Sequence, residues 1–203
     1  MGEYSMHGEG SLISQLNSRL SALKIISKYS SFKTRLMISN GIFISKLIYL
    51  IQLWSGCEQY LIKALQIVQN KAARVVTNSN KYTSIKTLLQ QCGWLSVSQL
   101  AAYHSLVLMY NTLKTECPRY LYQKIVTQLP YYLVAPYHTR LAESNNMTIV
   151  VPQVDPNLKL TENSFRWRGS NLWSRLPKSI QTVANVKLFK AKVRAWILEK
   201  IPI

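Results

Sequence analysis

Residues that could support catalysis are few and widely spaced in this chain of 203 residues. Asp155 is the only aspartate, and it lies between Pro152 and Pro156. Phosphoryl transfer assisted by two metal ions needs several carboxylates that converge on those ions. The eight acidic residues are scattered and form no two pairs at helical or strand spacing. We therefore predict that this chain alone is not an enzyme.

The histidines and glycines give no sign of a metal or cofactor site. His7, His104 and His138 lie far apart, and none is near two cysteines at zinc-binding spacing. The glycines form no phosphate-binding loop, and no nucleophile elbow is present. We predict no metal and no cofactor, and we expect His104, in an apolar stretch, to be a core histidine. A Ser-His-Asp triad stays open, because its members need not be close in sequence.

Basic residues beside aromatic ones are the positive chemical signal. Phe165, Arg166, Trp167 and Arg168 place two guanidinium groups, which bind phosphate, next to rings on which bases can stack. The alternative is that the rings belong to the core and the arginines face water.

A second basic stretch runs from Gln69 to Arg74. Lys71 and Arg74 are three residues apart and would project together from a helix. Ala72 and Ala73 between them permit close approach of another helix or of a ligand backbone. The alternative is a solvated face above a tight helix contact.

The charge of the chain points to a polyanionic partner. Lysine and arginine number 25 against eight acids, which gives a formal charge of +17. Glu58 is the only acid between residues 10 and 115, and Glu199 is the only acid from residue 164 onward. The basic residues lie in segments that we expect to fold, so we predict that they form a nucleic-acid-binding surface with a defined shape. A basic protein with a solvated surface is the alternative.

The sequence favours an intracellular protein, in the nucleus or the cytoplasm. Its first ten residues do not resemble a secretory signal. Cys57, Cys92 and Cys117 are expected to be reduced and mostly buried. The apolar stretch 36–54 contains Asn40 and Lys46, and no run without charge reaches the ~18 residues needed to span a membrane. We predict a buried helix there and no membrane partner.

Hydrophobic spacing predicts helices over residues 12–126. Leu12, Leu16, Leu20 and Leu23 form one stripe. The next helices are expected at 32–54 with Ser31 as cap and Gly56 as terminator, at 58–76, from Thr83 or Ser84 to Gly93, from Ser96, and from Pro118 to about Val126. Ser96 followed by Gln99 has the form of a capping box.

The remainder of the chain divides into a proline-rich segment and further helices. Residues 127–163 read as a connecting segment, in which the tract 147–151 could pair as a short strand. Helices are expected at 165–176, ended by Pro177, and at 186–200, the latter burying Leu188, Phe189, Val193, Trp196 and Ile197. The predicted fold is mostly α: a helical bundle at 12–126, the connecting segment at 127–163 and a C-terminal helical extension at 164–203. Residues 1–11 are expected to be disordered.

Several stretches, taken in order, resemble the region that follows the polymerase palm in reverse transcriptases of non-LTR retrotransposons, the jockey and LINE-like group. In this sequence they read LNSRLSAL (16–23), SKLIY (45–49), LWSG (53–56), LQIVQNKAAR (65–74), GWLSV (93–97), Pro118-x-Tyr120-Leu121, Thr139-Arg140, SFRWR (164–168), LWSRLP (172–177) and LFK (188–190). Each motif is short, but their shared order makes the set specific. The family usually has asparagine where Ser174 stands.

The resemblance implies a function and sets its limit. It implies that 12–126 is a thumb-like domain of an RNA-directed DNA polymerase whose helices lie along the template-primer backbone. The family's catalytic aromatic-Ala-Asp-Asp turn and its endonuclease are absent from this sequence. A polymerase palm domain is therefore an expected partner, and the chain reads as a fragment of such a polymerase. It could equally be a truncated copy of the element without a function.

Three functional hypotheses follow. The leading one is a nucleic-acid-binding fragment that holds an RNA or DNA backbone without strong sequence preference, and it requires its cations to gather on one side of a rigid bundle. The second is a basic scaffold that binds acidic protein partners, and the third is an autonomous enzyme. The predicted contacts for nucleic acid are Arg19, Lys24, Lys33, Arg35, Lys46, Lys71, Arg74, Arg166 and Arg168.

Overall fold

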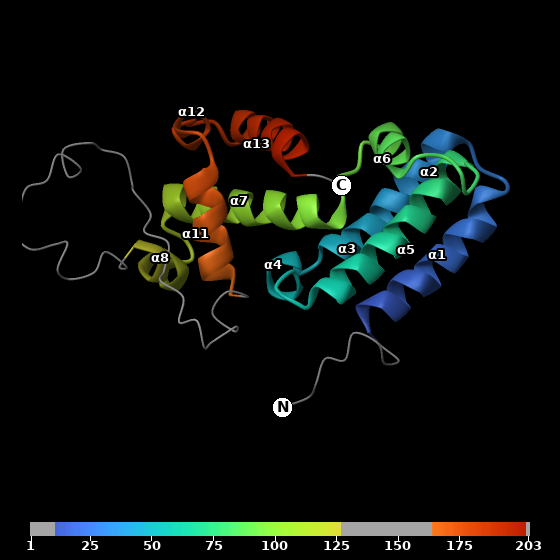
Figure 1. Cartoon of the computed structure of the whole chain (residues 1–203), viewed down its shortest axis with the longest axis horizontal. Helices are drawn as coiled ribbons and strands as arrows, with labels where there is room; N and C mark the ends of the chain where they lie inside the picture. Colours follow the sequence, from blue (N-terminus) through green and yellow to red (C-terminus); the bar gives the residue numbers. More distant parts are fainter. Residues whose placement is uncertain (1–10, 127–163, 202–203) are drawn as a thin grey trace, which may run out of the picture. The chain divides into compact units, whose positions relative to one another are not determined.

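The computed structural model describes residues 11–126 and 164–201, and every regular element in them is a helix (Figure 1). The predicted mostly α-helical class is therefore confirmed. The connecting segment and the possible strand at 147–151 lie outside the described residues. The described chain forms two compact units, residues 11–101 with 198–201 and residues 102–126 with 164–197. These units are defined by which residues pack together, whereas the predicted domains are defined by changes in residue composition along the chain.

The first unit consists of seven helical segments and the start of an eighth. They are α1 (Leu12–Ser27), α2 (Phe32–Ser39), the π-helix η1 (Asn40–Ile44), α3 (Ser45–Ile48), α4 (Ile51–Trp54), α5 (Gln59–Thr77), α6 (Ile85–Cys92) and the first turn of α7 (Val97–Thr115). The predicted stripe on α1 is correct, since Leu16, Leu20 and Leu23 are buried. Ser11, which the sequence placed in a disordered stretch, caps α1 by accepting a hydrogen bond from Ser14 N.

The predicted helix over residues 32–54 is wrong in its middle. It begins as expected at the Ser31 cap, but η1 inserts a wider turn, and the helix then stops at Tyr49 and Leu50. Leu50 has a left-handed backbone with φ of 51°, and α4 restarts after it with Ile51 buried. Trp54 Nε1 donates to Tyr49 O at 3.1 Å, which satisfies a carbonyl that the break leaves without a helical partner. Packing of Ile51 thus overrides an apolar run that favours a continuous helix.

Helix α5 is the central element of the first unit, in contact with α1, α2 and α6. Leu65, Ala72, Ala73 and Val76 are fully buried on one side of it. Burying a leucine of this size stabilises a fold by roughly 1.5–3 kcal/mol. The two alanines present no side chain beyond Cβ, which is consistent with their position in the tight helix contact that the sequence left open.

Polar side chains fix the turn between α6 and α7 onto α5. Gln69 is fully buried, and its Nε2 donates to Leu95 O at 2.8 Å. Val97 N donates to Gln66 Oε1 at 2.8 Å. The predicted capping box is present, because Gln99 N donates to Ser96 Oγ and Ser96 N donates to Gln99 Oε1. The bonds from Gln66 and Gln69 thus attach the turn at 95–97 to α5.

The second unit is formed by most of α7 together with α8 (Arg119–Val126), α11 (Phe165–Arg175), α12 (Lys178–Gln181) and most of α13 (Val186–Lys200). Tyr110 and Phe189 stack with ring centroids 4.0 Å apart, and Trp173 lies beside Phe189. The Tyr110 hydroxyl lies 2.7 Å from Ala184 O, so this buried ring also keeps a polar partner. Gly169 lets α11 approach α7 closely, because a Cβ there would lie 3.1 Å from Met109 Sδ.

Two details of the second unit differ from the sequence predictions. Leu188 was expected in the core but is half exposed, and Trp196 is only partly buried, whereas Phe189, Val193 and Ile197 are fully buried. The short helix α12 after Pro177 was not predicted. The cap at Ser164 is correct, since its hydroxyl accepts from Trp167 N.

Candidate nucleic-acid interface

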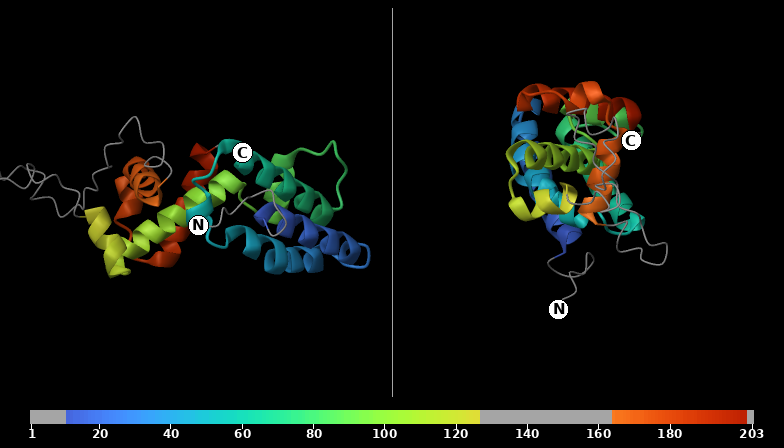
Figure 2. Two further views of the ribbon diagram at one scale, coloured as in Figure 1. Left: turned by 90° about the horizontal axis from the view of Figure 1, so that it is seen from below. Right: turned by 90° about the vertical axis from the view of Figure 1, so that its left-hand side faces the viewer.

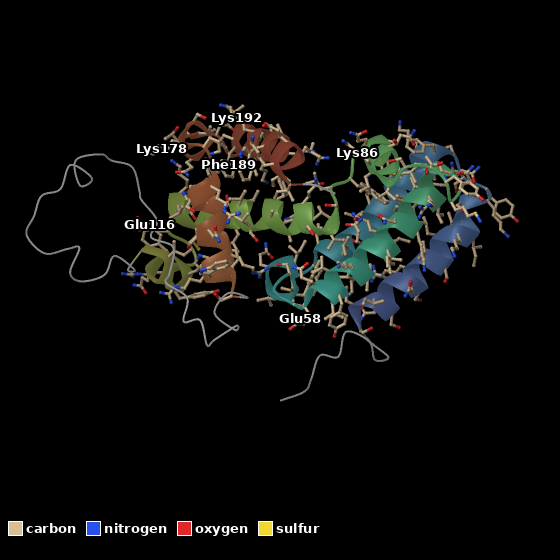
Figure 3. All side chains as sticks on the ribbon, viewed as in Figure 1. Glu58, Lys86, Glu116, Lys178, Phe189 and Lys192 are labelled. Carbon is tan, nitrogen blue, oxygen red and sulfur yellow. The ribbon has the colours of Figure 1, made fainter. Side chains whose placement is uncertain are left out.

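The described helices carry far more positive charge than they can neutralise internally. Within residues 11–126 and 164–201 the acids are Glu58, Glu116 and Glu199, and Glu199 pairs with its neighbour Lys200 at 2.7 Å. Figure 3 shows exposed lysines such as Lys86 and Lys178 directed away from the helices that carry them. Since so few acids are available, most of these cations need counterions from outside the fold.

Two of the predicted contacts hold the fold together. Arg35 Nε donates to Val76 O at 2.8 Å, and its Nη1 donates to Ser27 O and Ser30 O. Arg19 Nη1 donates to Ile42 O. Arg35 therefore satisfies carbonyls at helix ends and in a turn, where backbone acceptors have no helical partner, whereas Arg19 binds a carbonyl within η1. Sequence alone cannot distinguish this use of arginine from phosphate binding.

Lys71 and Arg74 do lie together, on the solvent side of α5. With Tyr60, Lys63 and Ile67 they fall within an arc of about 80° around the helix and extend over about 21 Å of its length. We call these five residues the α5 stripe. Lys63 and Lys71 are exposed, and Ile67 between them is also exposed. The buried side of α5 lies opposite the α5 stripe.

Arg74 differs from the lysines of the α5 stripe because it is only partly exposed. Its Nε is buried and, among the described residues, makes no hydrogen bond. A buried donor without an acceptor is costly, and a charged one more so. An anion that binds the exposed part of this guanidinium therefore contacts a side chain whose movement is already restricted by packing.

Lys24 and Lys33 lie at the turn between α1 and α2, in the last turn of one helix and the first turn of the next. Both are exposed. Lys46 stands apart from them on α3, where its Nζ lies 5.4 Å from the centre of the Tyr49 ring. The first unit thus has two clusters of predicted contacts, the α5 stripe and the α1–α2 turn, rather than one.

Arg166 and Arg168 belong to the second unit, on α11. Both are half buried, as are Phe165 and Trp167, and the Nε of Arg166 is buried without an acceptor among the described residues. Contact between α11 and α8 accounts for part of this burial. Trp167 therefore does not present a fully open ring for stacking.

Sequence reasoning missed other exposed groups. Lys63 and Tyr60 complete the α5 stripe, and Tyr29 and Tyr82 are among the most exposed side chains, each directly after a lysine. In the sequence, the Lys-Tyr pairs at 28–29 and 81–82 could have indicated that these tyrosines are exposed beside positive charge. Met37, Tyr49, Leu50 and Leu53 also leave an apolar surface open along the interrupted segment.

His104 and Cys92 lie outside these clusters and are partly or fully buried. Burial lowers the pKa of the His104 imidazole, and the positive charge of Lys190 lowers it further. Burial raises the pKa of the Cys92 thiol to about 11, so this thiol stays protonated near neutral pH. Cys57 is half buried and Cys117 is exposed, so the expectation of mostly buried cysteines holds for Cys92 alone.

The described residues contain no gathering of three or more histidine, cysteine or acidic side chains that could hold a metal ion. None of the helices in residues 11–126 and 164–201 is both long and apolar enough to cross a membrane. Comparisons of the chain with protein-family models, with curated proteins and with solved structures gave no match.

Proposed function

We propose that this chain is a thumb-like fragment of a non-LTR retrotransposon reverse transcriptase that holds a nucleic-acid backbone, in the nucleus or cytoplasm, without sequence preference and without catalysis of its own. The observation that carries the proposal is the α5 stripe, in which Lys63, Lys71 and Arg74 share one open face of a buried helix. The order of family-like motifs in the sequence supports the same assignment.

The mechanism rests on rigidity and charge. Gln66 and Gln69 hold α5 against the turn at 95–97, so the cations of the α5 stripe keep their spacing when a polyanion approaches. Each phosphate that a lysine or arginine neutralises releases a condensed counterion, which favours binding at low salt. Such contacts carry no base information, because they touch only phosphate oxygens.

Salt titration of duplex binding tests this proposal. The variant Lys63→Gln with Lys71→Gln should weaken binding to all duplex sequences about equally and should reduce the slope of log affinity against log salt by about two, because each phosphate contact contributes about 0.9. The matched control is Lys178→Gln with Lys192→Gln, which removes the same charge from exposed sites in the second unit and should leave the slope near that of the parent chain. Equal slopes for all three proteins would refute backbone binding by the α5 stripe.

A scaffold that binds acidic proteins is the second candidate. The apolar surface formed by Tyr49, Leu50 and Leu53 beside Lys46 favours it, because monomeric proteins rarely leave clustered large apolar groups open. An acidic protein bound at this apolar surface would remain bound in the presence of excess RNA or DNA. If the leading proposal is correct, excess RNA or DNA displaces any polyanion that binds to the α5 stripe. A primer-extension assay on the purified chain distinguishes both from an autonomous polymerase.

A further inference from the structure

One end of the first unit combines open aromatic rings with lysines. The turn between α1 and α2 and the loop between α5 and α6 lie at this end in Figure 1 and in the left view of Figure 2. Arg35 links them, because it bonds the carbonyls of Ser27 and Ser30 in the turn and that of Val76 in the last turn of α5. Two segments far apart in sequence are thus held together by one side chain.

The rings at this end do not contribute to the core. Tyr29 is 89% exposed, Tyr82 is 82% exposed and Phe32 is 42% exposed. Single exposed rings are ordinary, but three at one end of a small unit are not. Tyr82 N and Thr83 Oγ1 both donate to Asn80 Oδ1, so Tyr82 lies in a hydrogen-bonded turn of the loop between α5 and α6.

The charge that the described residues place at this end is positive. Exposed Lys24, Lys28, Lys33 and Lys81 lie in the turn, the loop and the adjoining helix ends. Glu58 precedes the first turn of α5, about 30 Å away along that helix. The dipoles of the helices largely cancel here, because α1 and α5 end where α2 and α6 begin. Among the groups in residues 11–126 and 164–201, the lysine ammonium groups therefore determine the local potential.

Rings and cations are interleaved, which favours a polyanion with flat, unpaired groups. Lys81 Nζ lies over the Tyr82 ring, 5.1 Å from its centre, and because Tyr82 is 82% exposed, the rest of the ring is open to a ligand. Bases in a duplex already stack on one another, and only unpaired bases can stack on an open ring. A membrane surface fits less well, because the lysines separate the rings instead of bordering a continuous apolar face.

We propose that this basic–aromatic end, formed by Lys24, Lys28, Tyr29, Phe32, Lys33, Lys81 and Tyr82, is a second binding site that takes single-stranded nucleic acid by stacking bases on its rings. It uses residues separate from the α5 stripe and does not require duplex binding there. The lysines would contact the phosphates that join the stacked bases, without reading their sequence.

The test uses the full chain and compares a fluorescent 12-nucleotide oligothymidine with a 20-base-pair duplex. Tyr29→Ala with Tyr82→Ala should lower affinity for the oligonucleotide at least tenfold, given the usual contribution of stacking on two rings. Affinity for the duplex should stay within about twofold. Tyr29→Phe with Tyr82→Phe should retain oligonucleotide binding, because the ring faces remain. Tyr120→Ala, at an exposed tyrosine of the second unit, is the matched control and should change neither affinity.

Two results would overturn the proposal. One is oligonucleotide affinity that is unchanged in the double alanine variant while its thermal unfolding matches the parent chain. The other is tyrosine-dependent binding to phosphatidylserine vesicles without binding to the oligonucleotide. The two proposals can fail separately, because Lys63→Gln with Lys71→Gln should lower duplex affinity and leave oligonucleotide affinity unchanged. Unchanged duplex affinity in that variant would contradict duplex binding by the α5 stripe but not the oligonucleotide site.

Discussion

Arg35 and Lys71 carry the same formal charge but have different surroundings. Arg35 is partly buried and donates to three backbone carbonyls, whereas Lys71 is exposed on the open face of α5. Charge and helical position, which are visible in sequence, select both residues equally. The carbonyl of Val76 that accepts from Arg35 is 41 residues away in sequence, so this part of its structural role becomes visible only in the folded chain.

Replacing Arg35 should therefore affect stability more than surface lysines do. Arg35→Met keeps the length of the side chain but removes its donors, and hydrogen bonds to a charged group contribute about 1.5–3 kcal/mol each. Because these bonds share one side chain and water can replace part of them, we expect the free energy of unfolding to fall by roughly 3 kcal/mol. Urea unfolding followed by circular dichroism measures it.

Lys33→Met is the control for Arg35→Met, since Lys33 lies on the same helix and is exposed. Its free energy of unfolding should stay within about 0.5 kcal/mol of the parent value. If Arg35→Met unfolds at the same urea concentration as this control, the carbonyl contacts of Arg35 do not stabilise the fold.

At the scale of elements, local signals predicted the ends of helices well. Ser31, Ser84, Ser96 and Ser164 stand at the starts of helices as their residue type predicts, and Gly93 ends α6 with a left-handed φ of 64°. Each of these signals depends on one residue and the backbone groups within a turn of it. Predictions of this kind need no knowledge of the tertiary contacts.

The break at Leu50 shows where local signals were insufficient. No glycine or proline marks residues 49–50, and residues 47–51 around them are apolar or aromatic. The helix is interrupted so that Ile51 reaches the core, which leaves Leu50 half exposed in a conformation that L-residues rarely adopt. A burial preference at one position thus determined the backbone of its neighbour.

Leu50→Gly should for this reason be neutral to stabilising, although glycine usually weakens a helical region. Relief of the left-handed conformation is worth about 1–2 kcal/mol, offset by about 0.5–1 kcal/mol from the greater freedom of the unfolded chain. We expect a rise of roughly 0.5–1 kcal/mol in the free energy of unfolding. Leu50→Ala keeps the strained backbone and should not raise the free energy of unfolding. If Leu50→Gly and Leu50→Ala lower the free energy of unfolding by the same amount, this account of the break is wrong.

At the scale of the whole molecule, the sequence predicted the excess of positive charge but not its arrangement. The net charge of +17 follows from composition alone. That Lys63, Lys71 and Arg74 share one face depends on which side of α5 its neighbours cover, and that the α1–α2 turn meets the α5–α6 loop depends on how these helices pack. The predicted single cationic side therefore became two separate clusters in the first unit.

The same charge should make the fold more stable as salt increases. Positive charges at this density repel one another in the compact state, and raising the ionic strength from about 0.01 M to 0.1 M shortens the screening length from about 30 Å to about 10 Å. Because about 1 kcal/mol corresponds to roughly 2–4 °C for a chain of this size, we expect sodium chloride over that range to raise Tm by a few degrees. Lys63→Gln with Lys71→Gln, which has less self-repulsion, should show a smaller rise.

Affinity for duplex should fall over the same salt range, because phosphate contacts lose the benefit of counterion release. Thermal unfolding and duplex binding measured in one salt series thus test the two consequences of a single charge distribution. A Tm that falls with salt would show that attractive ion pairs, and not repulsion between cations, dominate the electrostatics of this fold.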